Sequence, residues 1–429
     1  MIFDENNNVK ERESARAILV GVSAGEDISY SMDELAALAE AAEIEVLGSM
    51  VQNMERFNSA TLIGSGKVEE LKDLCASMEA DLVIFNDELS GMQLRNVEEA
   101  VDVKVIDRTI LILDIFADRA VSKEGKLQVE LAQLQYRMPR LLGFGKALSR
   151  LGGGIGTRGP GEKKLETDRR HIRRRMDEIK KELAALKDDR SVQRARREKS
   201  GLPVVALAGY TNSGKSSLMN RLLAMQSKED KQVFEKDMLF ATLDTAQRLI
   251  NLDDNRSFIL IDTVGFVSRL PHGLVDAFKA TLEEVTMADL ILHVVDASIE
   301  EKDFHAEVTN GVLRELGAAD KENILVFNKI DLAPDFELLG YGQDAVCISC
   351  RTGQGIEELT ELIKKKLFSD IELTELLIPY ERGDAVSALI GKVKPLELEY
   401  RADGTYIKAE LSAEDRGRWQ KFIIRTEAC

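Results

Sequence analysis

The sequence has few cysteines, few aromatic residues and no long apolar run. Its 429 residues include 4 Cys and 1 Trp, and aromatic residues make up 5% of the chain. Four scattered cysteines are too few for a disulfide framework, which indicates a reducing, cytoplasmic location. No apolar run approaches the ~20 residues of a membrane-spanning helix, and the polar, acidic N-terminus does not resemble a secretory signal. We therefore expect no integral membrane segment, while peripheral association with a membrane stays open.

The sequence is also short of basic residues when it is counted as a whole. Lys and Arg number 58 against 75 Asp and Glu, which gives a net charge of −17. Taken over the whole chain, this charge argues against binding nucleic acid, because phosphate repels it. However, residues 137–199 hold 20 basic and 9 acidic residues, a local charge of +11, which leaves −28 for the remainder. So uneven a distribution marks a segment with its own function.

Residues 1–114 alternate short apolar runs with helix-like stretches, which predicts a small α/β domain with a mainly parallel sheet. Ser31 followed by Glu34 has the spacing of a capping box and predicts that a helix begins at Ser31. The expected strands are 17–22, 44–51, 81–85 and 103–106, and the expected helices are 31–42, 66–79 and 90–101.

Residues 115–200 carry two apolar seams with heptad-type spacing. They are separated by a connector with eight glycines between Gly143 and Gly161. This pattern predicts an antiparallel helical hairpin with a glycine-rich tip at 143–164; two helices packed on a neighbouring domain are the alternative. The seams consist of Leu127, Leu131, Leu134, Met138 and Leu141, and of Ile172, Met176, Ile179, Leu183 and Leu186.

Residues 201–369 contain a phosphate-loop motif that follows an apolar strand and precedes a helix. Backbone N–H groups of such a loop converge on phosphates, and the helix dipole adds to the attraction. Lys215 is expected to reach the β- and γ-phosphates as a catalytic residue, and Ser216 to ligate Mg²⁺. The residues expected to bind GTP here are Gly209, Tyr210, Thr211, Asn212, Ser213, Gly214, Lys215, Ser216 and Ser217. The strands expected in this part are 203–208, 248–252, 258–261, 290–296, 324–328 and 345–349.

Further motifs follow later strands in the order that a GTPase requires. Asp262 is expected to hold Mg²⁺ through water, and Gly265, the second catalytic candidate, to offer its N–H to the γ-phosphate. Asp331 is placed to accept two hydrogen bonds from the guanine edge, where adenine offers no such pair of donors. These motifs add Thr263, Val264, Asn328, Lys329, Ser349, Cys350 and Arg351 to the expected GTP-binding residues.

The first switch is less regular in sequence. Thr242 is the candidate hydroxyl for Mg²⁺ and the γ-phosphate, and therefore the third catalytic candidate, with Thr245 as the alternative. Phe266 stands where many GTPases place a water-orienting Gln, which predicts slow intrinsic hydrolysis and external acceleration. Asn212 raises the hypothesis that K⁺ binds beside the phosphates. The switch residues expected to contact GTP are Phe240, Ala241, Thr242, Leu243 and Asp244.

The glycine-rich tip and the return helix are rich in basic residues. Glycine lets a backbone approach a groove closely, and Arg and Lys neutralise phosphates. A solvated helix usually balances its charges, and this one does not, so RNA binding is expected. The candidate RNA-binding residues are Lys146, Arg150, Arg158, Lys163, Lys164, Arg169, Arg170, Arg173 and Arg174.

Together these motifs resemble the HflX family of GTPases, within the group that includes the Obg GTPases. The resemblance covers nearly the whole chain and is carried by Leu151-Gly-Gly, Thr157-Arg-Gly-Pro-Gly-Glu162, Leu165-Glu-Thr-Asp-Arg-Arg170, Gly209-Tyr-Thr-Asn212 and Phe240-Ala-Thr-Leu-Asp244. It implies binding to the large ribosomal subunit and its rRNA, splitting of stalled or idle ribosomes under stress, and faster GTP hydrolysis on the ribosome.

The chain departs from that family in the first switch, where Thr245-Ala246 replaces the usual Pro-Thr. The C-terminal part, 370–429, is expected to be a small α+β domain. A GTPase acting on a protein or membrane partner and an ATP-using rRNA remodeller remain alternative functions. No sequence feature demands a dimer, so a monomer is expected.

Overall fold

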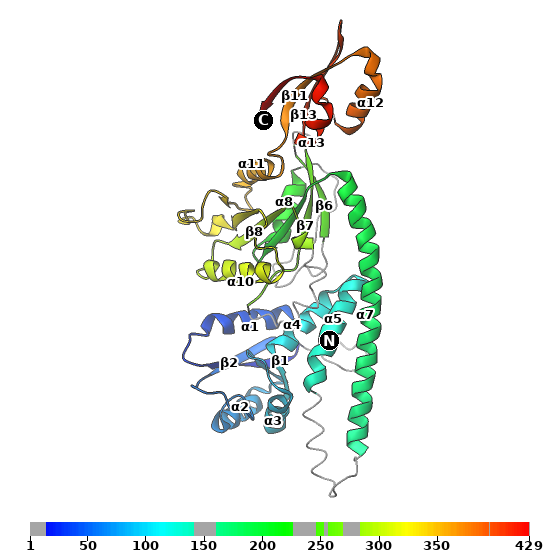
Figure 1. The fold of residues 1–429 in the computed structure, drawn as a ribbon. Helices are drawn as coiled ribbons and strands as arrows, with labels where there is room; N and C mark the ends of the chain where they lie inside the picture. Colours follow the sequence, from blue (N-terminus) through cyan, green and yellow to red (C-terminus); the bar gives the residue numbers. More distant parts are fainter. Residues whose placement is uncertain are drawn as a thin grey trace. The chain divides into compact units, whose positions relative to one another are not determined.

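The computed structural model describes most of the chain as two compact units, residues 1–356 and 357–429 (Figure 1). Among the described residues, no helix combines the length and apolarity that crossing a bilayer requires. The predicted first switch and the hairpin residues Lys146, Arg150 and Arg158 lie outside the described residues, as does Leu141 of the first seam. The described residues are 14–140, 160–225, 246–252, 256–268, 284–393 and 395–428.

The first unit opens with a four-stranded, fully parallel sheet in the order β2-β1-β3-β4. Consecutive side chains of a strand point to opposite faces of a sheet. Accordingly, Leu19 packs in one core with α1 and α4, while Ile18 and Val20 pack in another core with α2 and α3. The predicted parallel α/β arrangement is confirmed. Its elements are β1 (Arg16–Ser23), α1 (Ser29–Ala41), β2 (Glu45–Asn53), α2 (Ser65–Met78), β3 (Leu82–Phe85), α3 (Gly91–Val101), β4 (Lys104–Asp107) and α4 (Arg108–Arg119).

The capping box predicted at Ser31 is wrong. Helix α1 begins two residues earlier, and Ile28 occupies the N-cap without a side-chain hydrogen bond. The Ser31 hydroxyl donates to Asn86 Oδ1 at 3.2 Å, and the carboxylate of Glu34 is buried in an ion pair with Arg108. A long-range partner for Glu34 therefore replaces the local backbone contact.

The helical hairpin consists of α5 (Lys123–Arg140) and α7 (Pro160–Ser200), which lie side by side (Figure 1). Pairing of Lys123 with Glu182 and of Glu130 with Arg175 shows that the helices are antiparallel. The described seam residues form one apolar cluster, as predicted. However, α5 also buries Val129 and Ala132 in the core of the N-terminal sheet. The two sequence alternatives thus coexist, because one face of α5 meets α7 and another meets the α/β domain.

The end of α5 is fixed to the N-terminal α/β domain through a buried aspartate. Asp107 is fully buried and accepts a hydrogen bond from the Tyr136 hydroxyl at 2.6 Å. Arg140 pairs with Asp107 at 3.3 Å and lies 3.3 Å from the centre of the Tyr136 ring. A side chain at Gly91 would meet the Arg140 carbonyl at 2.5 Å. These contacts hold the last turn before the glycine-rich tip in a defined place.

The rest of the first unit is a six-stranded sheet in the order β10-β9-β8-β5-β7-β6. Among the described strands of this sheet, only β6 runs antiparallel to its neighbour. The carboxyl ends of its parallel strands therefore meet at one edge. The elements are β5 (Val204–Gly209), α8 (Lys215–Ala224), β6 (Ala246–Asn251), β7 (Ser257–Asp262), β8 (Leu290–Asp296), α10 (Lys302–Glu315), β9 (Asn323–Asn328) and β10 (Ala345–Cys347).

The second unit is a small α+β fold with an antiparallel sheet in the order β12-β13-β11-β14. Its core buries Leu376, Ile407 and the ring of Trp419. The sequence predicts strands at 397–401 and 405–411 and a helix near 384–390, which correspond to β12, β13 and α12. Strands β11 and β14 and helix α13 were not predicted from the sequence. The elements are α11 (Ile356–Leu367), β11 (Glu372–Ile378), α12 (Gly383–Lys392), β12 (Glu397–Arg401), β13 (Gly404–Leu411), α13 (Ala413–Trp419) and β14 (Ile423–Ala428).

Candidate nucleotide site

The phosphate loop leaves β5 at Gly209 and enters α8 at Lys215. Gly209 and Gly214 adopt φ values of +152° and +93°, in which other residues are strained. A side chain at Gly209 would meet the Val294 carbonyl at 2.2 Å, and one at Gly214 would meet Asn328 Nδ2 at 2.1 Å. Both glycines are thus required for the backbone to pack against β8 and the end of β9.

Lys215 is already held over the phosphate loop. Its ammonium donates to the carbonyls of Gly209 at 3.0 Å and Tyr210 at 2.7 Å. Burial lowers the pKa of Lys215 to about 8, although the nearby Asp262 carboxylate favours the charged form. The side chain therefore remains a cation at neutral pH, with one N–H left to reach a phosphate.

The two candidate Mg²⁺ ligands in the described residues lie side by side. The Ser216 hydroxyl donates to Asp262 Oδ2 at 2.6 Å, and Asp262 is fully buried at the end of β7. A hydroxyl and a carboxylate are hard oxygen donors that suit Mg²⁺. Gly265 lies so close to the loop that a side chain there would meet Thr211 Cα at 2.7 Å.

Two residues of the Asp262–Gly265 motif face the protein interior instead of the loop. The Thr263 hydroxyl donates to the Leu207 carbonyl at 2.6 Å, and Val264 is buried in the core. The next residue, Phe266, is also buried, and its N–H donates to the Gly209 carbonyl at 3.1 Å. Its carbonyl accepts from the Thr211 N–H at 2.7 Å. The backbone after Gly265 is thus bonded directly to the phosphate loop.

The guanine-side motifs meet the phosphate loop through Asn328. Its amide donates to the Ser213 carbonyl at 2.9 Å and accepts from the Cys350 N–H at 3.1 Å. Lys329 adopts the left-handed conformation, with φ +65°, and pairs with Asp296 at 2.8 Å. The structure therefore brings together the segments that contain Ser213, Asn328 and Cys350, and the first and last of these segments are more than 100 residues apart in the chain.

Asp331 is held by its two neighbours on the guanine side. It accepts from the Ser349 hydroxyl at 2.6 Å and pairs with Arg351 at 2.7 Å. The hydrogen bond from Ser349, reinforced by Arg351, lowers the pKa of this carboxyl. The side chain is consequently ionised at neutral pH and acts only as a hydrogen-bond acceptor.

Only some of the candidate RNA-binding residues lie in the part of the hairpin that the structure describes. On α7, Arg170, Arg173 and Arg174 are exposed and Arg169 is half-buried. In the described part of the hairpin, no ion pair neutralises these exposed arginines. Arg175, by contrast, pairs with Glu130 at 2.6 Å. The side chains of Lys163 and Lys164, like the first switch from Phe240 to Thr245, lie outside the description.

Sequence reasoning missed a buried histidine close to Lys215. His293 lies in β8, and its pKa is lowered to about 4, first by burial and then by the Lys215 ammonium. The signal in the sequence that could have indicated its burial is its position inside the apolar strand expected at 290–296.

His293 should make the protein less stable in acid. Between pH 6.5 and 4 the unfolded chain binds a proton at this position that the folded chain does not, so stability falls as pH drops through this range. A pKa difference of this size corresponds to at most about 3 kcal/mol. We expect His293→Gln to lose less thermal stability than the wild type between pH 7 and pH 4.5. His171→Gln, at an exposed position on α7, should behave like the wild type; equal pH dependence in both variants would contradict the assignment.

The geometry defines the class of protein. A phosphate loop, a buried Asp beside its Ser, and an Asn-Lys-x-Asp segment that contacts the loop meet at the carboxyl edge of one sheet. This arrangement is that of a P-loop GTPase.

The comparisons with known proteins identify the family. Three sequence-family profiles match: "GTP-binding GTPase N-terminal" over 29–117, "GTP-binding GTPase Middle Region" over 119–197, and "50S ribosome-binding GTPase" over 204–329. GTPase HflX of Caldanaerobacter subterraneus is 48% identical and covers 96% of this chain and 95% of its own. GTPase HflX of Escherichia coli is 40% identical and covers 86% of each chain. The chain belongs to the HflX family of GTPases and hydrolyses GTP to GDP and phosphate.

Proposed function

We propose that this GTPase binds the large ribosomal subunit through its basic hairpin and splits stalled or idle ribosomes under stress. The observation that carries the proposal is the set of exposed arginines Arg170, Arg173 and Arg174 on α7. The hairpin is stiffened by its apolar seam and fixed to the α/β domain at Asp107. It therefore presents positive charge on a rigid support, as binding to rRNA phosphates requires.

Nucleotide would control this binding through the switches. Ser216 and Thr242 would ligate Mg²⁺ directly and Asp262 would hold it through water, which would order the first switch in the GTP state. Hydrolysis would release the switch and the subunit. Asn212, at φ +59° in the phosphate loop, is the residue through which K⁺ would act.

Replacing Arg173 by Glu tests the proposal. In co-sedimentation with large subunits in GTP, GDP and a non-hydrolysable analogue, we expect weaker binding in every state that binds. The slope of log affinity against log salt should fall by about 1, because one phosphate contact is lost. Lys72→Glu, which makes the same charge change at an exposed position on α2, is the matched control.

Two results would contradict the proposed function. One is the absence of binding by the wild type in any nucleotide state. The other is an equal loss of affinity for the Arg173 and Lys72 variants, which would point to net charge instead of a hairpin contact and would favour a protein or membrane partner.

A further inference from the structure

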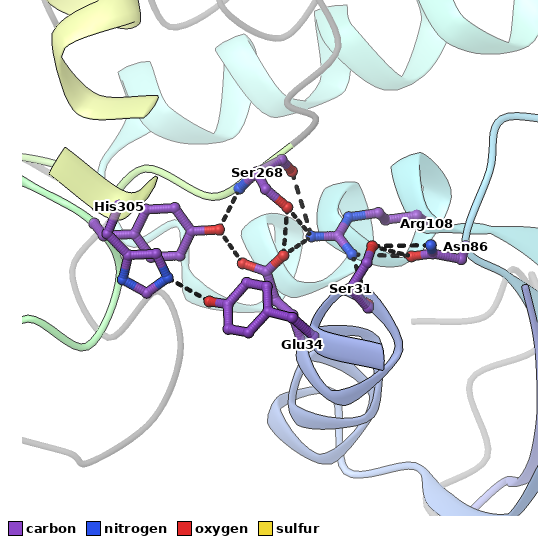
Figure 2. Close-up of polar contacts among 8 residues, drawn as sticks. Ser31, Glu34, Asn86, Arg108, Ser268 and His305 are labelled. Carbon is purple, nitrogen blue, oxygen red and sulfur yellow. Dashed lines mark hydrogen bonds and ion pairs between the residues drawn. The ribbon is translucent and has the colours of Figure 1, made fainter. Parts of the chain in front are cut away.

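A buried polar cluster joins the N-terminal α/β domain to the nucleotide site (Figure 2). Glu34 from α1 and Arg108 from α4 meet Tyr210 of the phosphate loop and Ser268, which follows β7. All four residues are between 2% and 7% exposed. Burying an ion pair this deeply is costly unless further hydrogen bonds satisfy its atoms, so the remaining contacts decide what the cluster does.

The carboxylate of Glu34 is the centre of these contacts. It accepts from the Tyr210 hydroxyl and, at 2.5 Å, from the Ser268 hydroxyl. The Arg108 guanidinium pairs with the same carboxylate and reaches the Ser268 hydroxyl at 3.2 Å. The Tyr210 hydroxyl in turn accepts the backbone N–H of Ser268 at 2.5 Å.

These contacts connect two segments that handle the nucleotide. The carbonyl of Tyr210 holds the Lys215 ammonium. Ser268 comes three residues after Gly265, whose N–H is expected to meet the γ-phosphate. The intervening Phe266 is already bonded to the loop through its backbone. The Tyr210 hydroxyl adds a second attachment beyond Phe266, and Glu34 fixes the direction of that hydroxyl.

We propose that Glu34 is a positioning residue for GTP hydrolysis, supplied by the N-terminal α/β domain. By orienting the Tyr210 hydroxyl, it keeps the segment from Gly265 to Ser268 against the phosphate loop before nucleotide arrives. Because this segment is already ordered, the binding free energy of the γ-phosphate is not reduced by the entropic cost of ordering it.

The ring of Tyr210 is held independently of its hydroxyl. It stacks on the imidazole of His305 with centroids 3.6 Å apart and planes 8° apart. Burial, and next the Glu34 carboxylate, raise the pKa of Tyr210, so the hydroxyl stays protonated and donates to Glu34. Removing only the hydroxyl therefore separates the positioning contact from the packing of the ring.

The test is Tyr210→Phe in the full chain, with Tyr341→Phe as the matched control. Tyr341 likewise donates its hydroxyl to a carboxylate, Asp303 Oδ1 at 2.7 Å, but among the described residues this hydroxyl has no contact with the phosphate loop or Ser268. For Tyr210→Phe we expect single-turnover GTP hydrolysis to slow about tenfold, the effect of roughly 1.4 kcal/mol. Affinity for a non-hydrolysable GTP analogue should fall similarly, and affinity for GDP should stay unchanged.

Glu34→Gln gives a second measurement on the same contact. The amide still reaches Tyr210 but cannot neutralise Arg108, so a smaller thermal stability accompanies the slower hydrolysis. If Glu34→Gln does not fold, Tyr210→Phe alone decides. Equal effects of Tyr210→Phe and Tyr341→Phe, a parallel loss of GDP and GTP-analogue affinity, or faster hydrolysis in Tyr210→Phe would each overturn the proposal. Because these are measurements without ribosomes, failure here leaves the proposed ribosome binding untouched.

Discussion

Replacing Lys215 by Met is expected to slow GTP hydrolysis by about 10²- to 10³-fold, the usual cost of losing one preorganised charge on a reacting phosphate. Two carbonyls already hold the Lys215 ammonium over the loop, so it need not be reorganised when GTP binds. Methionine keeps the apolar stem and removes the charge. The loss should therefore appear in turnover at saturating GTP.

The same variant should not be less stable than the wild type. Burial lowers the pKa of Lys215, which means that the folded chain holds this cation at a cost in stability. Removing the charge leaves the packing of α8 in place, so the thermal midpoint should be unchanged or higher. Lys67→Met on α2, where the ammonium pairs with Glu70 near the surface, is the control that should keep full turnover. A Lys215 variant with more than a tenth of wild-type turnover would contradict this role.

The core of the nucleotide site could be predicted from the sequence because its signals are local. Each motif follows an apolar run, and parallel strands bring their carboxyl ends to one edge of the sheet. Asp262 and Asn328 therefore had to lie near Ser216 and Ser213 once the strands were recognised, and the structure places them within hydrogen-bond distance. The apolar seam of the hairpin was predictable because its signal is also local, a regular spacing of apolar residues along each helix.

The polar cluster at Glu34 could not be predicted from the sequence. The helical period of α1 was recognised, but Ser31 and Glu34 also fit a capping box, and no local pattern distinguishes a capping carboxylate from a buried one. The partners of Glu34 are 74 residues away at Arg108 and 234 away at Ser268. Arginine is usually exposed and is rarely buried without a partner. Because no partner of Arg108 can be identified from the sequence, nothing in the sequence indicates that Arg108 is buried. Only tertiary packing determines which of these polar residues meet.

Packing of α5 on a neighbouring domain was one of the two alternatives, but the residues that make this second buried face were not identified, for a related reason. Val129 and Ala132 lie off the heptad seam and are small or isolated in sequence, so they read as ordinary helix residues. Their burial depends on the N-terminal sheet, whose apolar residues are distant in the chain. Strands β11 and β14 share this limitation, because their pairing with each other joins residues about 50 positions apart.

Asp331→Asn is expected to lower GTP affinity by about 10²- to 10⁴-fold and to shift preference towards xanthosine nucleotides. The carboxylate is expected to accept from both guanine N1–H and the exocyclic amine, and each such charged hydrogen bond is worth roughly 1.5–3 kcal/mol. Asparagine turns one acceptor into a donor, which clashes with the guanine amine but matches the carbonyl that xanthine carries there.

The surroundings of Asp331 make this substitution a clean test. Ser349 can still donate to the amide oxygen at this position, and only the exposed Arg351 loses its charged partner. Little stability should therefore be lost. Competition of GDP and XDP for the variant, and turnover of GTP and XTP, measure the shift. Asp335→Asn removes the same charge from an exposed position four residues away and should keep the preference for guanine. If Asp331→Asn kept it as well, Asp331 would not recognise the base, and an ATP-driven activity on RNA would become the better explanation of the exposed arginines on α7.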